Sequence, residues 1–143
     1  MKLPHNRTWY TKKLLEKAKR CIKERDRYTC QYCGKECVGS DCHASHVENV
    51  GAHKNMELDP SNLKVLCSYH HLHWWHKDVR DSSKWFNEKF PKRADYLDRM
   101  IALKFKIPTA MLAELHENTK ADGSDYAVKY YEMIKEIVDG NAV

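Results

Sequence analysis

Apolar side chains recur at helical spacing near the start of the chain. Between residues 11 and 25 they form one stripe, with Lys and Arg on the opposite face: Leu14, Leu15, Ala18, Cys21 and Ile22. This pattern is typical of an amphipathic helix, and Thr11 is placed to cap its start. Because Cys21 lies on the apolar stripe, we expect it to be a buried thiol and not a metal ligand.

The periodicity is lost between residues 27 and 67, where turn-forming residues such as Gly34, Gly51 and Asp59-Pro60 interrupt the chain. A short strand is predicted over Cys42–Val47. The apolar run Leu63–Leu66 is either a second strand or the entry to a helix. Residues 68–77 fit a helix.

From residue 82 onward the pattern is helical. Four helices are predicted: one capped by Ser82 and stopped by Pro91, one over residues 92–106, one with Pro108 at its first position and ending near Gly123, and one capped by Ser124. The large aromatic side chains before and within this region are expected to pack between the central and C-terminal helices: Trp74, Trp75, Trp85 and Phe86. The predicted fold class is α+β.

Composition limits the possible classes of protein. The chain has 143 residues, of which 42% are hydrophobic and 31% charged, so a single small folded domain with helical additions is expected. No apolar run approaches the ~18 residues of a membrane span, and the N-terminus lacks the apolar core of a secretion signal. We therefore expect no membrane association and a cytoplasmic location.

Charge is distributed unevenly. Residues 1–25 hold nine Lys or Arg against two Glu, whereas residues 107–143 hold three Lys against seven Asp or Glu. A basic arm suits a polyanionic partner such as DNA, although a solvated Lys-rich helix explains the same charges. The expected phosphate contacts are Lys12, Lys13, Lys17, Lys19, Arg20 and Lys23.

Cysteine and histidine are concentrated in the middle of the chain. Five of the six Cys lie between residues 30 and 67, and seven of the nine His lie between residues 43 and 76. In a chain without an export signal this clustering favours metal binding over disulfides. A C-x-x-C pair and a later C-x-x-H pair predict a tetrahedral structural zinc site made by Cys30, Cys33, Cys67 and His70. Combinations that include Cys37 or Cys42 remain open.

The remaining central histidines are too many for one structural ion: His43, His46, His71, His73 and His76. A neutral imidazole accepts a proton from water near pH 7, and a divalent ion stabilises negative charge on a phosphate. Together they suggest hydrolysis of a phosphate ester.

Four segments occur in a characteristic order: C-Q-Y-C-G, A-S-H-V, D-P-S-N-L-K-V-L-C and C-S-Y-H-H. Over residues 25–80 the chain resembles the HNH endonucleases, which are ββα-metal (His-Me finger) nucleases, with an added zinc knuckle. The segments G-A-H-K-N, H-W-W-H-K-D and K-W-F-N-E-K-F-P-K-R-A-D-Y-L look like phage HNH proteins related to the NinG/Rap recombination nucleases. The resemblance implies three parts: a basic helical arm (1–26), a zinc-knuckle nuclease core (27–80) and a helical extension (81–143).

The resemblance also implies a role for individual residues. His46 matches the general base, and Asn62 matches the residue that holds the loop and positions this base. His71 matches a ligand of the catalytic ion, with His76 and His43 as further candidate ligands. The implied cofactors are a structural Zn²⁺ and one catalytic divalent ion, which is Mg²⁺, Mn²⁺, Ni²⁺ or Zn²⁺.

One position departs from the family pattern. Many HNH enzymes have Asp directly before the base, as an anionic metal ligand, and here this residue is Ser45. His43 shares the strand face of Ser45 and is a candidate replacement, and His53 in the following loop is a second. A site made of histidines would favour ions softer than Mg²⁺.

The leading hypothesis is therefore a metal-dependent DNA endonuclease that acts in phage recombination, replication or packaging, with DNA and phage proteins as partners. Ser45 motivates one alternative, a zinc-stabilised DNA-binding module without catalysis. The acidic C-terminal segment motivates another, an accessory protein that works through contacts with other proteins.

Overall fold

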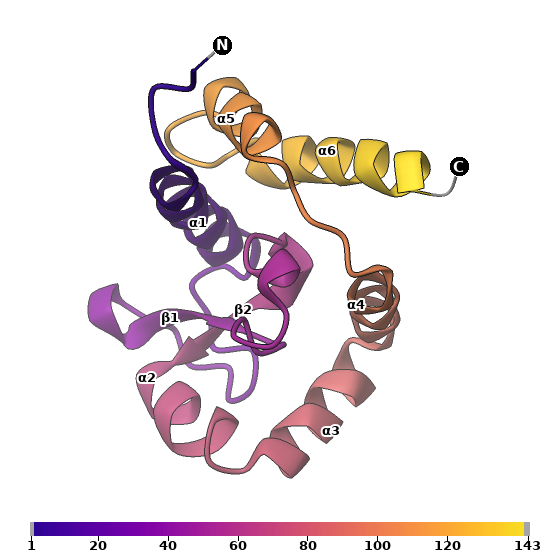
Figure 1. Ribbon diagram of the computed structural model, residues 1–143. Helices are drawn as coiled ribbons and strands as arrows, with labels where there is room; N and C mark the ends of the chain where they lie inside the picture. The colour runs from indigo at the N-terminus through magenta and orange to yellow at the C-terminus, as the bar shows by residue number, and fades with distance from the viewer. Residues whose placement is uncertain (1, 142–143) are drawn as a thin grey trace.

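The computed structural model describes residues 2–141 (Figure 1). Within this range the chain forms six α-helices and one antiparallel sheet of two strands, which confirms the α+β class. In chain order the elements are α1 (Arg7–Arg25), β1 (Cys42–His46), β2 (Leu63–Cys67), α2 (Ser68–His70), α3 (Val79–Lys89), α4 (Pro91–Leu103), α5 (Thr109–Asn118) and α6 (Tyr126–Asn141).

Helix α1 begins earlier than the sequence pattern predicts. The side chain of Asn6 accepts a hydrogen bond from the backbone N–H of Trp9, so Asn6 and not Thr11 is the N-cap. Leu14 and Ile22 are fully buried, as expected for the apolar stripe, whereas Cys21 is only partly buried at its edge.

Strands β1 and β2 pair antiparallel, with Cys42 opposite Cys67 and His46 opposite Leu63. The run Leu63–Cys67 is buried at every position and is the second strand, which settles the alternative left open by its sequence. Residues 47–62 form the β1–β2 loop, which contains short 3-10 turns at Lys54–Met56 and Pro60–Asn62.

The helix expected over residues 68–77 is divided into two kinds of turn. One α-helical turn, α2, passes into a π-helical segment at His71–Trp75. In a π-helix the repeat is i to i+5, so side chains five residues apart come to the same side. This local winding places His71 and His76 next to one another.

The helices after residue 78 also differ in their ends from the prediction. Asp78, whose side chain accepts from Asp81 N–H, caps α3, while Ser82 is buried inside that helix and donates to the carbonyl of Trp75. Pro108 precedes α5 as its N-cap, and this helix ends at Asn118, before Gly123. Helix α6 begins at Tyr126, two residues after the expected cap, Ser124.

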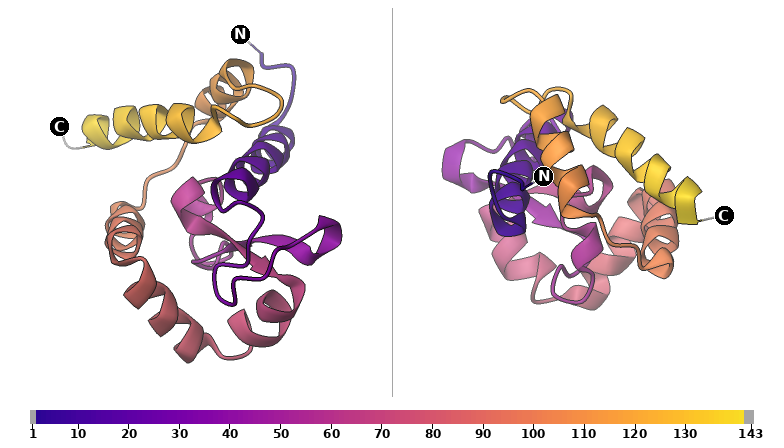
Figure 2. Two further views of the ribbon diagram at one scale, coloured as in Figure 1. Left: turned by 180° about the vertical axis from the view of Figure 1, so that it is seen from behind. Right: turned by 45° about the horizontal axis from the view of Figure 1, so that its top comes forward.

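One hydrophobic cluster joins the three expected parts of the chain. It includes Leu14 of α1, Leu66 of β2 and Leu112 of α5, all buried. Figure 2 shows α5 and α6 lying across the end of the molecule where α1 starts, while α3 and α4 follow its other side. The three parts therefore share a core. Within residues 2–141, no helix has both the length and the apolar character needed to cross a bilayer.

Tyrosines from the C-terminal helices bind the β1–β2 loop. The buried Tyr126 hydroxyl donates to the carbonyl of Leu58 at 2.6 Å, and the Tyr96 hydroxyl donates to Asp59 Oδ2 at 2.8 Å. Burial raises the pKa of Asp59 to about 6, although the bonds from Tyr96 and Ser61 oppose the rise. Helices α4 and α6 thus hold the loop that carries Asn62.

Candidate metal centre and histidine groove

The four predicted zinc ligands converge in space. The ligand atoms of Cys30, Cys33, Cys67 and His70 all lie within 4.8 Å of one another. Cys33 Sγ is 4.0 Å from Cys67 Sγ, and Cys67 Sγ is 3.1 Å from His70 Nδ1. Thiolates around one zinc ion with bonds of about 2.3 Å lie about 3.8 Å apart. The donor types and spacings therefore fit a closed tetrahedral Cys₃His metal site, and we call these residues the zinc cluster.

Local turns bring the two halves of the zinc cluster together. The N–H of Gly34 donates to the carbonyl of Cys30, and Gly34 adopts a positive φ of 77° that closes the knuckle. The N–H of Gln31 donates to the carbonyl of Val65, which ties the knuckle to β2 just before Cys67. Cysteine ligands distant in sequence are thus fixed by backbone hydrogen bonds.

Two other central cysteines stay outside the zinc cluster. Cys37 and Cys42 are buried, and neither belongs to a group of converging ligand atoms among the described residues. Burial, with smaller contributions from neighbouring thiols and Asp41, raises the pKa of the Cys37 thiol to about 12. Both are therefore core thiols, and the alternative ligand sets that used them are not formed.

The expected aromatic packing surrounds the zinc cluster. Tyr32 of the knuckle stacks on Trp74 with ring centroids 3.8 Å apart, and Trp85 of α3 meets both rings edge-on. Trp75 and Phe86 are buried in the core. The aromatic side chains thus fasten the knuckle to α3.

A second group of side chains lines a groove of about 540 Å³ beside β1. His46, His71 and His76 all face this groove, together with Lys19 of α1. We call it the histidine groove. Strand β1, the segment after β2 and the first helix each contribute one wall, so residues far apart in sequence meet there.

The hydrogen bonding of His46 defines its tautomer. Its Nε2 lies 2.9 Å from the carbonyl oxygen of Glu57. A carbonyl only accepts, so Nε2 carries the proton and Nδ1 holds a lone pair. Burial, and then the charges of Lys19 and Lys64, lower the pKa of His46 against the opposing effect of the Glu57 bond. His46 is therefore neutral near pH 7 and able to accept a proton.

Asn62 is fully buried and holds the β1–β2 loop. Its Oδ1 accepts from the N–H of Glu48 at 2.8 Å, and its Nδ2 donates to the carbonyl of Met56 at 3.0 Å. Its own carbonyl accepts from the N–H of Val47, directly after His46. Because Val47 follows His46 and Glu57 follows Met56, Asn62 holds the backbone next to His46 and next to the carbonyl that its ring contacts.

A chain of hydrogen bonds orients His71. His43 Nε2 lies 2.9 Å from the carbonyl of Ser40, and His43 Nδ1 lies 2.8 Å from His71 Nδ1. The Ser40 carbonyl accepts a hydrogen bond from the N–H of His43 Nε2. The other ring nitrogen, His43 Nδ1, is therefore unprotonated and accepts a hydrogen bond from His71 Nδ1. His71 Nε2 is then left with a lone pair, 3.0 Å from His76 Nε2.

This arrangement separates the three candidate metal ligands. Two nitrogens bound at about 2.1 Å to one ion lie roughly 3.0–3.4 Å apart, so the Nε2 atoms of His71 and His76 fit a shared cation. His43 binds the opposite nitrogen of His71 and does not line the groove. A hydrogen bond of this kind is typical of residues that orient metal-bound histidines, and the prediction of His43 as a direct ligand stays a prediction.

Neither expected replacement for the acidic ligand is in place. His53 lines a different cavity, on the far side of the β1–β2 loop. The Ser45 side chain is buried, where its hydroxyl accepts from Lys64 Nζ at 3.2 Å and donates to the carbonyl of His46. The single Lys in the apolar run L-K-V-L-C is the sequence feature that indicates this buried partner of Ser45, and no role was predicted for it. Fully buried Lys64 faces Trp75 at 3.2 Å from the ring centroid, and burial lowers its pKa well below the usual value.

The predicted basic arm is only partly an exposed surface. Lys17 is buried, and its ammonium donates to the carbonyls of His116 and Thr119 and to Thr119 Oγ1. It is therefore a structural residue and not a phosphate contact. Arg20 is exposed but donates to the carbonyl of Ala121. Of the remaining predicted contacts, Lys12 is exposed, Lys19 lines the histidine groove, and Lys13 and Lys23 are half-buried.

Comparisons of the chain with family models, with curated proteins and with solved structures return no match.

Proposed function

We propose that the chain is a metal-dependent DNA endonuclease of the HNH, or ββα-metal, type. His46 ends β1, Asn62 lies directly before β2 and His71 directly follows α2, which is the order of the motif. The observation that carries the proposal is the protonation pattern of His46, whose Nδ1 lone pair is directed by a fixed bond at Nε2. A neutral base of this kind, lining a groove with a cation donor pair, suits hydrolysis of a phosphodiester.

In the proposed reaction the side chains of the groove have separate roles. His46 Nδ1 takes a proton from a water molecule, which attacks phosphorus in line with the leaving 3′ oxygen. Lys19 lies in the groove and attracts the phosphate. His71 and His76 would hold a divalent ion, which would stabilise the negative charge that develops on the phosphate and leaving group. His43 holds His71 in the required tautomer.

The test compares plasmid nicking by the zinc-loaded wild-type protein and by His46→Ala, with Mg²⁺, Mn²⁺, Ni²⁺ or Zn²⁺ added. We expect nicking by the wild type and a loss of at least about 10³-fold in His46→Ala. His73→Ala is the matched control, because His73 is an exposed histidine outside the groove. Absence of nicking with every ion, or equal nicking by both proteins, contradicts the proposal.

The buried hydroxyl of Ser45 favours one other function. Because Ser45 bonds to Lys64 and offers no carboxylate to the groove, the chain would bind DNA without cutting it if two histidines hold the ion too weakly. Salt-dependent DNA binding by a zinc-loaded protein that never nicks would select this alternative.

A further inference from the structure

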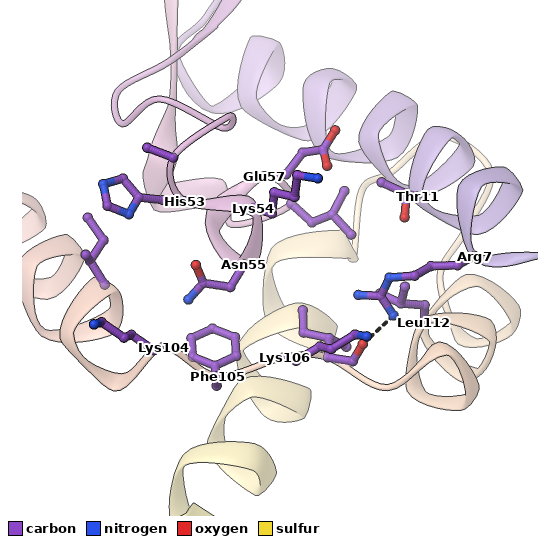
Figure 3. A pocket seen from close by; sticks show the side chains of 14 residues that line it. Arg7, Thr11, His53, Lys54, Asn55, Glu57, Lys104, Phe105, Lys106 and Leu112 are labelled. Carbon is purple, nitrogen blue, oxygen red and sulfur yellow. Dashed lines mark hydrogen bonds between the residues drawn. The ribbon is translucent and has the colours of Figure 1, made fainter.

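A cavity of about 770 Å³ lies across the β1–β2 loop from the histidine groove. Three segments distant in sequence enclose it: the start of α1, the turn at Lys54–Met56 and the linker between α4 and α5 (Figure 3). Its size lies in the range of sites that enclose small organic ligands, about 300–1,000 Å³. Nothing in the proposed nuclease mechanism uses these residues.

The charge of the cavity selects anions. Four cationic side chains line it, and Glu57 is its single acidic lining residue: the cations are Arg7, Lys54, Lys104 and Lys106. Among the described residues none of the four forms an ion pair. The three Lys side chains come to the cavity from the loop and the linker, and together with Arg7 they outnumber Glu57, so the lining carries a net positive charge.

Arg7 is held in position with donors to spare. Its Nη1 donates to the carbonyl of Ile107 at 2.6 Å and to Thr109 Oγ1 at 3.3 Å. Within residues 2–141, no acceptor is bonded to its Nε or Nη2. A guanidinium fixed on one nitrogen and free on the others is prepared to bind a phosphate through a pair of parallel bonds.

Two further features suit a ligand with a flat heteroaromatic part. Asn55 lines the cavity, and its Nδ2 is shielded from solvent without a hydrogen-bond partner among the described residues. This is a costly state for an amide, and rotation of the side chain toward a ligand acceptor would relieve it. The floor of the cavity is apolar, since Leu58, Phe105 and Leu112 line it and are otherwise buried. Figure 3 shows Asn55 and Phe105 among the side chains that line the cavity.

We propose that this cavity binds a nucleotide, with its phosphate on Arg7 and the lysines and its base against Phe105 and Asn55. A free anion alone would leave the apolar floor and Asn55 unused, and an uncharged ring would leave the four cations unused. The same chemistry is offered by a free mononucleotide and by the 5′-phosphorylated end of a DNA strand. The proposal does not depend on the nuclease function, because no groove residue takes part.

Calorimetry on the full-length zinc-loaded protein tests the proposal with three probes: dAMP, deoxyadenosine and a 5′-phosphorylated hexadeoxynucleotide. His46→Ala is used with the oligonucleotide so that the strand is not cut. We expect deoxyadenosine to bind at least about tenfold more weakly than the phosphorylated probes, because it lacks the group that the cations recognise. Tighter binding of dAMP indicates a free mononucleotide as the ligand, and tighter binding of the oligonucleotide indicates the 5′-phosphorylated end of a DNA strand.

Matched charge variants locate the binding. Lys54→Glu with Lys106→Glu reverses two cations of the cavity, while Lys84→Glu with Lys92→Glu makes the same change of net charge at exposed positions outside it. We expect the first pair to weaken binding at least about tenfold and the second to leave it within about twofold. In NMR spectra the side-chain amide signals of Asn55 should shift on binding.

Three results overturn the proposal. The first is that neither phosphorylated probe binds at millimolar concentration, and the second is that deoxyadenosine binds as well as dAMP. The third is that the two double charge-reversal variants weaken binding equally. Plasmid nicking by the same preparations is measured separately, so failure of nucleotide binding and failure of the nuclease proposal give different results.

Discussion

The zinc cluster and the histidine groove are adjacent, since the turn after β2 supplies His70 to the first and His71 to the second, and they differ in how their donor atoms are directed. In the zinc cluster four ligand atoms converge within 4.8 Å, so a metal ion there has no open position. In the groove His71 offers one nitrogen to His76 and the other to His43, so two donors at most face the same point. Convergence closes a structural site, whereas divergence leaves coordination positions for a substrate and water.

The largest effect is expected from removal of a zinc-cluster ligand. Cys67→Ser should abolish stoichiometric zinc binding and lower the free energy of unfolding by more than about 3 kcal/mol, because metal binding and folding are coupled. Zinc content and circular dichroism measure the two effects. Cys21→Ser is the control, since Cys21 lies outside the zinc cluster and is only partly buried. A Cys67→Ser protein that keeps its zinc and its fold would refute the structural role.

Removal of a groove ligand should act on activity alone. We expect His71→Ala to lower DNA nicking by about 10²–10³-fold and to keep the zinc content and thermal stability of the wild type. Single-turnover nicking with saturating Mn²⁺ provides the measurement. If His71→Ala instead releases the zinc ion, the zinc cluster and the histidine groove form one unit, and the contrast between a structural and a reactive site does not hold.

A smaller loss is expected from the orienting residue. His43→Ala removes the acceptor of the His71 Nδ1 proton, so the proposed ion should bind about 10–100-fold more weakly. Titration of nicking with Mn²⁺ separates this from a loss of the maximal rate, which excess ion should largely restore. His43→Asn, which can still accept a hydrogen bond, should recover part of the affinity. An unchanged ion requirement in His43→Ala would mean that the His43–His71 bond has no role.

The smallest effect concerns pH. A general base works only when neutral, and burial lowers the pKa of His46, so the neutral form persists below the ordinary value of about 6.5. The midpoint of the fall in nicking rate on acidification should therefore lie below pH 6.5. Lys19→Met removes one of the nearby positive charges and should move the fall toward higher pH. A midpoint above 6.5 in the wild type would contradict the role given to burial.

Sequence reasoning succeeded where the chemistry is local. The two ligand pairs around Cys30 and Cys67 are recognisable because each pair needs only two intervening residues to reach one ion, and β1 follows from its flanking turns. Sequence reasoning failed where a hydrogen-bond partner distant in sequence decides whether a side chain is buried. Lys17 reads as an exposed cation, yet its acceptors at Thr119 lie 102 positions later.

The type of helical turn after β2 and the directions of individual side chains could not be predicted from the sequence either. The π-helical turn that brings His76 to His71 has no simple signature in H-L-H-W-W. The direction of His53 depends on how the β1–β2 loop is held, and tyrosines far along the chain decide that. The sequence thus indicated that His46 and His71 lie close together, while the bond between His43 and His71 became visible only in the structure.

The hydrogen bonds from Tyr96 and Tyr126 to the β1–β2 loop bear on how this protein can be shortened. A fragment of residues 27–80 would keep His46, Asn62 and His71 and would lose Lys19. The stretch from Leu58 to Asn62 would also lose its anchors, and the neighbouring Glu57 carbonyl, which sets the His46 tautomer, would no longer be held in place. The proposed reactive centre is therefore not expected to function as an isolated fragment, because residues from the last third of the chain hold its loop in place.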